Sequence, residues 1–170
     1  MKQRIAIVAV IVPVIMMVTW LGSLVLDVYR AKEVVLQIEG YDPRSLLYGH
    51  YLQYNVRYGI TAPEPKTVSD WRRRVACMCL SDSTPSKGTW LGRCADRDKQ
   101  QCPLYIVGWQ FGDQFMGGIE RYYIPEEYQE ALATIPNNST ITVRVTPSGG
   151  ATVVGMHVAG EPILEYAKRL

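Results

Sequence analysis

The sequence predicts a mostly β extracytoplasmic domain that follows one N-terminal transmembrane helix, and three observations lead to this fold class. The N-terminal region holds an uncharged apolar run long enough to cross a bilayer. The rest of the chain contains short segments rich in β-branched and aromatic residues, in which apolar and polar side chains alternate. In this second part of the chain, segment 125–132 is predicted to be a helix. A proline suits the first position of a helix, and the acidic side chains that follow suit the positive end of the helix dipole. We therefore expect a β-rich α+β domain.

The apolar run extends from Ile5 to Leu26 without a charged side chain. At about 1.5 Å per residue it spans roughly 33 Å, which is enough for a hydrocarbon core about 30 Å thick. A cleaved signal peptide has a shorter apolar region and small residues at its cleavage site, whereas this run ends in Leu24-Val25-Leu26. A buried helix of a soluble protein would show a polar face. We therefore expect an uncleaved anchor.

The charges that flank this run predict its orientation. Lys2 and Arg4 precede it without an acidic residue, whereas the charges that follow it cancel. The positive-inside rule then places the N-terminus in the cytoplasm. The expected organisation is a cytoplasmic segment at 1–4, an anchor at 5–26, a linker at 27–32 and an extracytoplasmic domain at 33–170. In a bacterium with two membranes, the anchor would lie in the inner membrane and the domain in the periplasm.

The alternating pattern predicts strands along the whole domain. They are expected at 33–38, 50–58, 74–80, 104–109, 118–124, 141–146 and 151–158. Ser148-Gly149-Gly150 predicts the turn between the last two. The second strand would place four side chains on one face, namely Leu52, Tyr54, Val56 and Tyr58. The polar segment 81–101 is expected to be a loop, and 164–170 a short helix or a tail.

Four cysteines lie in or beside this loop, within an insertion at about 77–102. They are Cys77, Cys79, Cys94 and Cys102. Outside the cytoplasm an even number of cysteines indicates disulfides. Cys77 and Cys79 share one face of a strand and are poorly placed to bond to each other, so two connectivities remain. A nested hairpin favours Cys79–Cys94 with Cys77–Cys102. Zinc binding and free thiols are the alternatives, although C-x-C departs from the usual C-x2-C zinc knuckle.

Two blocks of sequence resemble the bacterial GDYXXLXY protein family. The first is YDPRSLLYGHY at 41–51, which is similar to the DPR-x-L-x-x-G-D-Y block that follows the anchor in that family. The second is GIERYYIPE at 118–126, and the strand around 143–145 with its glycine turn matches the end of the pattern. His50 replaces the signature Asp, and the cysteine insertion is not part of the pattern. The resemblance implies a membrane-anchored protein that often accompanies polytopic membrane proteins.

These blocks supply the candidate residues for binding a partner or a ligand. They are Asp42, Arg44, Gly49, Tyr51, Glu120 and Tyr122. The Asp-Pro-Arg turn holds a carboxylate and a guanidinium in a geometry suited to an ion pair, and Gly49 permits a positive φ before a strand. The first block either fixes the entry into that strand or contacts a partner. Glu120 and Arg121 predict an exposed or cross-strand charge pair.

Charge and motifs exclude several function classes. The chain has 18 Lys and Arg against 16 Asp and Glu, and Lys2 and Arg4 account for the excess. A neutral domain without a basic stripe argues against binding to nucleic acid. The sequence contains no P-loop, dinucleotide-binding or HExxH motif. We therefore expect no catalytic residue, no cofactor and no resident metal ion.

The expected function is that of a non-enzymatic accessory or structural subunit of a cell-envelope assembly, which sits in the lipid bilayer and contacts a polytopic membrane partner. Two alternatives stay open. One is a membrane hydrolase similar to signal peptidases, with Ser45 as nucleophile and Lys66 or Lys87 as base. The other is a module that binds a small ligand through tyrosines of the sheet, which are Tyr51, Tyr54, Tyr58, Tyr122 and Tyr123.

Overall fold

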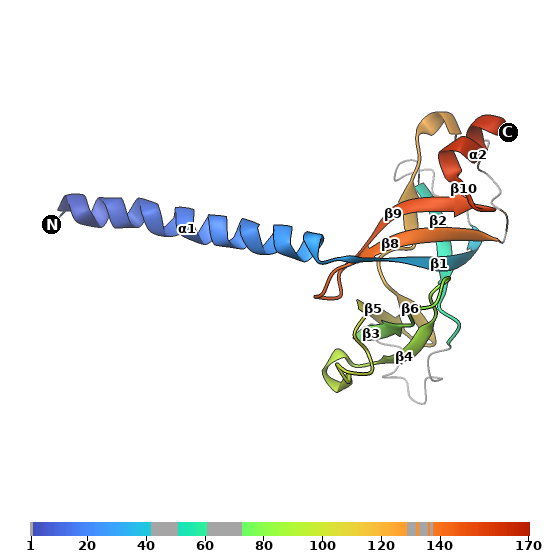
Figure 1. Cartoon of the computed structure of the whole chain (residues 1–170), viewed down its shortest axis with the longest axis horizontal. Coiled ribbons are helices and arrows are strands. Elements are labelled where there is room, and N and C mark those ends of the chain that lie inside the picture. Colours follow the sequence, from blue (N-terminus) through green and yellow to red (C-terminus); the bar gives the residue numbers. More distant parts are fainter. Residues whose placement is uncertain (1, 42–50, 61–72, 129–131, 133–135, 137) are drawn as a thin grey trace.

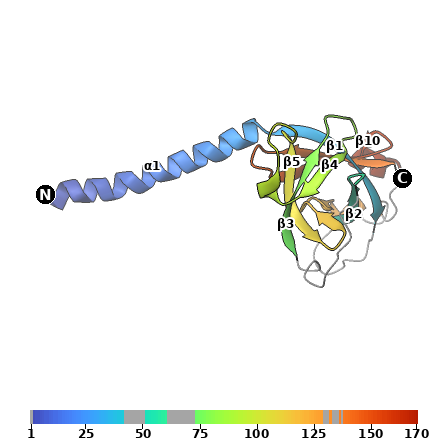
Figure 2. The same ribbon diagram turned by 90° about the horizontal axis from the view of Figure 1, so that it is seen from below.

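A computed structural model gives the architecture, in which one long helix leads into two antiparallel β-sheets (Figure 1). The structure describes residues 2–41, 51–60, 73–128, 132, 136 and 138–170. Helix α1 (Lys2–Tyr29) extends away from one end of the β domain. The smaller sheet lies below the larger one in Figure 1 and is therefore in front in Figure 2, which shows the protein from below.

Helix α1 contains a segment, Ile11–Tyr29, that is long and apolar enough to cross a membrane. None of this segment is buried against the rest of the protein. Thr19 and Ser23 of this segment bond to the helix itself, because Thr19 Oγ1 donates to the carbonyl of Ile15 at 2.9 Å and Ser23 Oγ to that of Trp20 at 2.7 Å. These two hydroxyls are therefore satisfied within the helix, as a lipid environment requires.

The larger sheet has six strands in the order β10-β9-β8-β1-β2-β7. Their bounds are β1 (Lys32–Tyr41), β2 (Tyr51–Arg57), β7 (Arg121–Tyr123), β8 (Ser139–Val145), β9 (Ala151–Val158) and β10 (Glu161–Pro162). Strand β1 follows α1 directly and lies between β8 and β2, so the residues next to the helix are part of the centre of the sheet.

The smaller sheet has four strands in the order β4-β3-β5-β6. They are β3 (Arg74–Leu80), β4 (Gly88–Gly92), β5 (Tyr105–Phe111) and β6 (Gln114–Met116). Backbone hydrogen bonds tie it to the larger sheet at both ends: the amide of Gly88 donates to the carbonyl of Tyr58 at 2.6 Å, and that of Val107 to the carbonyl of Gly149 at 2.8 Å. The two sheets thus enclose one apolar interior.

This interior is formed by the facing sides of both sheets. It contains fully buried side chains from the larger sheet and the smaller one, among them Leu36, Leu52, Ile141, Val143, Met78 and Ile106. The predicted face of β2 is confirmed, because Leu52, Tyr54 and Tyr58 are buried and Val56 packs against the core. Each fully buried aliphatic side chain contributes about 1.5–3 kcal/mol, so this contact dominates the stability of the domain.

The predicted strands are all present, and three further strands were missed. Those missed are β4, β6 and β10, which have two to five residues each and are too short for alternation to be recognised. The loop predicted at 81–101 therefore contains a strand, followed by the short 3-10 helix η2 (Cys94–Asp96). At 164–170, where a short helix or a tail was expected, the structure has the helix α2 (Ile163–Arg169).

The helix predicted at 125–132 is confirmed only in its first turn. The structure has the 3-10 helix η3 (Glu126–Tyr128), and the amide of Leu132 donates to the carbonyl of Tyr128 at 3.0 Å. Residues 129–131 lie outside the part of the chain that the structure describes. Leu132 is fully buried, so packing as well as this hydrogen bond holds Leu132 in place.

All four cysteines form disulfides, but the favoured pairing was wrong. The bonds are Cys77–Cys94 and Cys79–Cys102, with Cα–Cα distances of 4.9 and 5.5 Å. Strand β3 lies between β4 and β5, with Cys77 opposite Gly92 of β4 and Cys79 opposite Tyr105 of β5. Cys94 follows β4 and Cys102 precedes β5, so each meets the β3 cysteine at its own end. The expected pairing was wrong because it assumed a simple nested hairpin, in which β3 would not lie between two strands.

The connectivity gives a direct chemical test. Cyanogen bromide cleaves after Met78 and separates Cys77 from Cys79, and trypsin cleaves after Arg97 and separates Cys94 from Cys102. Non-reducing mass spectrometry of the doubly digested protein should give fragments joined as 77–94 and 79–102. Fragments joined as 79–94 and 77–102 would contradict the fold of this insertion.

The Cys79–Cys102 disulfide has a predicted effect on stability. The two cysteines are 23 residues apart in sequence, and by the chain-entropy model a disulfide that closes a loop of that length stabilises the folded protein by about 3 kcal/mol. The variant Cys79→Ala/Cys102→Ala should therefore lose about 3 kcal/mol of unfolding free energy. Urea unfolding of the full-length protein in mild detergent measures this, with the intact protein as the reference.

Gly149 is the residue at which the β8–β9 turn contacts the smaller sheet. It has φ of +85°, and an added Cβ would lie 2.6 Å from Val107 Cγ2 and still closer to the Tyr105 ring. Gly160 has nearly the same φ, +86°, but an added Cβ would meet nothing within 4 Å. Comparing the two positions separates backbone strain from steric overlap.

We expect Gly160→Ala to cost about 1–2 kcal/mol of unfolding free energy from backbone strain alone. Gly149→Ala should cost about 2–5 kcal/mol, because overpacking adds to the same strain. Urea unfolding of the two variants gives the difference. Equal losses would mean that the turn does not press against β5.

Candidate functional site

Three of the four candidate residues of the first sequence block lie outside the residues that the structure describes. Asp42, Arg44 and Gly49 lie outside the described residues, as do Ser45 and Lys66 of the hydrolase alternative. Lys87, the other base considered for that alternative, is exposed.

The candidates of the second block and of β2 lie at the edge of the larger sheet. Tyr51 is opposite Tyr123 on β7, with ring centroids 6.0 Å apart, and the Arg121 guanidinium lies 5.1 Å from the centre of the Tyr51 ring. Tyr122 is opposite Leu52 and packs against the core. Arg121 therefore contacts an aromatic ring across the strands, and Tyr122 has a structural role.

Glu120 lies in a pocket between the two sheets, which we call the inter-sheet pocket. It has a cavity volume of about 380 Å³ and is lined by β1, β2, β3, β4 and the β5–β6 hairpin. Its chemistry combines carboxylates with aromatic rings, and the residues that carry it are Glu39, Asp113, Glu120, Tyr54, Tyr58 and Phe115. Of the sequence candidates, it brings Glu120 together with two of the tyrosines considered for ligand binding.

Hydrogen bonds hold Glu120 and Tyr54 in place within this pocket. One carboxylate oxygen of Glu120 accepts from the amide of Gly117 at 2.6 Å, and its backbone carbonyl accepts from the amide of Tyr54 at 3.1 Å. The Tyr54 hydroxyl in turn donates to the carbonyl of Ile119 at 2.6 Å. Burial is the main reason that the pKa of Tyr54 is raised far above its ordinary value, and the charge of Glu120 adds to the effect.

Tyr58 is the unusual member of this group. Its side chain is only 5% exposed, and its ring meets Phe115 edge-on with centroids 5.4 Å apart. Its hydroxyl oxygen is buried, and among the described residues it has no hydrogen-bond partner. Burial, followed by the charge of Glu120, raises the pKa of Tyr58 strongly, so the hydroxyl keeps its proton. A buried hydroxyl without a partner destabilises the folded state by about 1–3 kcal/mol, and such groups are rare in folded proteins.

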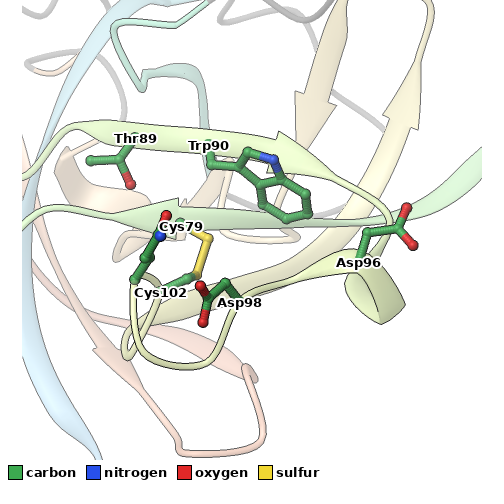
Figure 3. A pocket seen from close by; sticks show the side chains of 7 residues that line it. Cys79, Thr89, Trp90, Asp96, Asp98 and Cys102 are labelled. Carbon is green, nitrogen blue, oxygen red and sulfur yellow. A yellow bond between two sulfur atoms is a disulfide. The ribbon is translucent and has the colours of Figure 1, made fainter.

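A second pocket of about 380 Å³ lies over the insertion and is shown in Figure 3. Trp90 of β4, the Cys79–Cys102 disulfide and Asp98 surround it. Its acids are already engaged, because Asp96 forms an ion pair with Arg93 at 2.8 Å and Asp98 accepts from the amide of Gln100 at 2.9 Å. These contacts stabilise a disulfide-linked loop, and they leave neither carboxylate dedicated to a ligand.

The outer face of the smaller sheet carries an exposed apolar surface, which we call the outer patch. It consists of Val75, Val107, Trp109, Phe111 and Met116, each 37–50% exposed. Strand register places them on one face, because Trp109 is opposite both Val75 of β3 and Met116 of β6. The Arg73 guanidinium lies 4.3 Å from the centre of the Trp109 ring.

The insertion limits the outer patch on one side, because it covers part of the same face of the smaller sheet. Cys77 and Cys79 point to the same face as Val75, and their disulfides hold the insertion over that part of the sheet. Arg97 of the insertion lies 3.4 Å above the Tyr105 ring. Cys77 and Cys79 are thus buried, whereas the part of the face around Trp109 remains exposed.

Sequence reasoning missed both the outer patch and part of the inter-sheet pocket. Asp113 enters the pocket from the turn between β5 and β6, and the Gly112-Asp113 pair was the available signal for that turn. Among the described residues, no group of three or more His, Cys, Asp or Glu side chains is arranged to hold a metal ion.

The buried tyrosines predict a loss of stability at high pH. An unfolded tyrosine ionises near pH 10, whereas folded Tyr58 does so at a higher pH, so above pH 10 the folded state binds more protons. Stability should be intact below pH 10 and fall as the pH rises above it, by about 1.4 kcal/mol per pH unit for each such group.

The variant Tyr58→Phe should remove that share of the slope, and Tyr123→Phe should not, because Tyr123 is 72% exposed. Urea midpoints measured between pH 8 and pH 11.5 give the slopes. An unchanged slope for Tyr58→Phe would contradict the burial of its hydroxyl.

Comparison with known proteins gives one family. The family model described as "GDYXXLXY protein" matches residues 14–156, which include most of the apolar segment, the smaller sheet with the insertion, and the larger sheet as far as Met156 in β9. No curated protein and no solved structure matches the chain. Since the family model covers most of the sequence, this chain belongs to the GDYXXLXY protein family.

Proposed function

We propose that the chain is a membrane-anchored, non-enzymatic accessory subunit of a cell-envelope assembly, and that the outer patch is where it contacts a polytopic membrane partner. The observation that carries this proposal is the exposed apolar part of the outer face, with Trp109 at its centre. Large contiguous apolar surfaces are rare on monomeric proteins and commonly mark interaction sites.

The composition of the outer patch suits a protein contact. Trp, Met and Arg are enriched at interfaces, and aromatic residues with two rotatable bonds give a large contact area at a low entropic cost. Arg73 stacks on Trp109 and places a positive charge beside the apolar surface. The matching partner surface is apolar and carries a carboxylate at its margin.

The apolar helix supports a membrane location for this contact. An anchor through Ile11–Tyr29 confines the domain to the membrane surface and raises its effective concentration near other membrane proteins. A modest interface then suffices for association. The two disulfides fit an oxidising compartment, and with Lys2 and Arg4 before the helix they favour a cytoplasmic N-terminus and a periplasmic domain.

The proposal predicts that charges in the outer patch abolish association. In Val75→Glu/Trp109→Glu, two carboxylates replace apolar contacts at the centre of the interface and repel the carboxylate of the partner. We expect at least a tenfold loss of the co-purifying partner, since burial of an unpaired charge costs several kcal/mol. The measurement is purification of the tagged protein from its native membranes in mild detergent, followed by quantitative mass spectrometry.

Val154→Glu is the matched control, because Val154 is 42% exposed but lies on β9 of the other sheet. It should retain the partner. Equal recovery of a membrane protein with the double variant would refute the assigned surface. Recovery of further copies of the same chain alone would replace the accessory subunit by a homo-oligomer.

A further inference from the structure

We infer that the end of the domain next to α1 binds the headgroups of anionic phospholipids in the bilayer that holds the anchor. We call this end the juxtamembrane surface, and it consists of residues 30–32, the β8–β9 turn at 146–150 and residues 93–101 of the insertion. The inference rests on the anchor of the proposed function, but it does not depend on the outer patch or on its partner. The short connection between helix and sheet, the position of the turn and the insertion, and the charge of this end support it.

The connection between α1 and the larger sheet is too short to let the domain stand away from the bilayer. Helix α1 ends at Tyr29 and strand β1 begins at Lys32, so only Arg30 and Ala31 join them. The amides of both joining residues donate to carbonyls in the last turn of the helix, at 3.0 and 3.3 Å. When the apolar segment Ile11–Tyr29 spans the hydrocarbon core, the start of β1 therefore lies at the level of the headgroups.

Strand pairing brings the β8–β9 turn to the same end of the domain. Strand β8 is antiparallel to β1 and places Val145 opposite Lys32, so the turn that follows extends beyond the start of β1 toward the helix. The Tyr105 hydroxyl donates to the carbonyl of Pro147 in this turn at 3.2 Å, and the Arg97 guanidinium lies 3.4 Å from the centre of the Tyr105 ring. These contacts join the insertion to the turn, and Figures 1 and 2 both show the two segments at the end of the domain nearest α1.

The charge of this end favours an anionic partner. Among the described residues, the segments 27–33 and 93–101 together with Arg144 hold six basic and four acidic side chains. Two of the acids form ion pairs with two of the cations, at 2.7 and 2.8 Å. The other cations are Arg30, Lys32, Arg97 and Lys99, and the other acids are Asp27 and Asp98. Basic side chains beside a membrane span are attracted to anionic lipid, and their N–H groups donate to the phosphate oxygens.

The experiment measures how close two labels lie to the headgroups in nanodiscs that hold the full-length protein. Ser148→Cys places a bimane label on the β8–β9 turn, and Glu165→Cys places the matched label on α2, which lies away from α1 (Figure 1). The native cysteines form disulfides with one another, so each introduced thiol is labelled alone. The quencher is a nitroxide on the headgroup of phosphatidylcholine. The bilayers are phosphatidylcholine alone and its equal mixture with phosphatidylglycerol.

We expect the headgroup nitroxide to quench the Ser148 label more strongly than the Glu165 label in both bilayers. Phosphatidylglycerol should increase the quenching of the Ser148 label, because it draws the juxtamembrane surface toward the headgroups. In about 1 M salt this increase should disappear, since the Debye length falls to about 3 Å.

Charge variants test which side chains cause the increase. Arg97→Gln/Lys99→Gln removes two of the four cations and should remove about half of the increase. Arg30→Gln/Lys32→Gln removes the other two and should have a similar effect, so the test does not depend on the contact between Arg97 and Tyr105. Lys168→Gln/Arg169→Gln removes the same charge from α2 and should keep the full increase.

Several outcomes would overturn the inference. Equal quenching of the two labels would mean that the domain stands away from the bilayer. Quenching of the Ser148 label that does not respond to phosphatidylglycerol, or an increase that persists in both double variants, would exclude recognition of anionic headgroups. An intact mass that lacks α1 would refute the anchor and with it this inference. The outer-patch variant Val75→Glu/Trp109→Glu should show the full increase, and a reduced one would assign the effect to the outer patch instead.

Discussion

The apolar contact between the two sheets is the constraint on which the rest of this structure depends. The smaller sheet has four short strands and one face that must be buried, and Met78, Leu80 and Ile106 place that face against the larger sheet. Once this face is covered, the opposite face of the same strands is directed outward. The insertion, held by two disulfides, covers part of it and leaves the rest exposed. The disulfides thus define the boundary of the surface proposed to bind a partner.

The β5–β6 hairpin contributes side chains both to the outer patch and to the inter-sheet pocket. Phe115 turns inward to the inter-sheet pocket, whereas Trp109 and Phe111 turn outward. Met116 contributes to both, since it lines the pocket and is 39% exposed. A partner seated on the outer face would therefore touch the same hairpin that closes one wall of the pocket. The two are chemically distinct, because the outer patch is apolar with the Arg73 cation at its margin and the inter-sheet pocket is lined by carboxylates and aromatic rings.

Local patterns predicted the strands, whereas features that depend on the order of strands were missed or wrong. The alternation in β2 identified Leu52, Tyr54 and Tyr58 as inward residues, because a period of two is a local property. The disulfide pairing depends on β3 lying between β4 and β5, which no local pattern contains. For the same reason the sequence identified Glu120 and Tyr58 as separate candidates but did not indicate that they share a pocket with Asp113. That pocket exists only after the sheets have packed.

The position of β1 has a mechanical consequence. This strand continues from α1 in nearly the same direction, as Figure 1 shows, and it is hydrogen-bonded to β8 on one side and β2 on the other. A force between the helix and the far end of the domain would pull β1 along its own axis. The hydrogen bonds of both ladders lie across that axis, so they would share the load and would have to break together, not one after another. Tension applied through the helix would thus pass directly into the centre of the larger sheet.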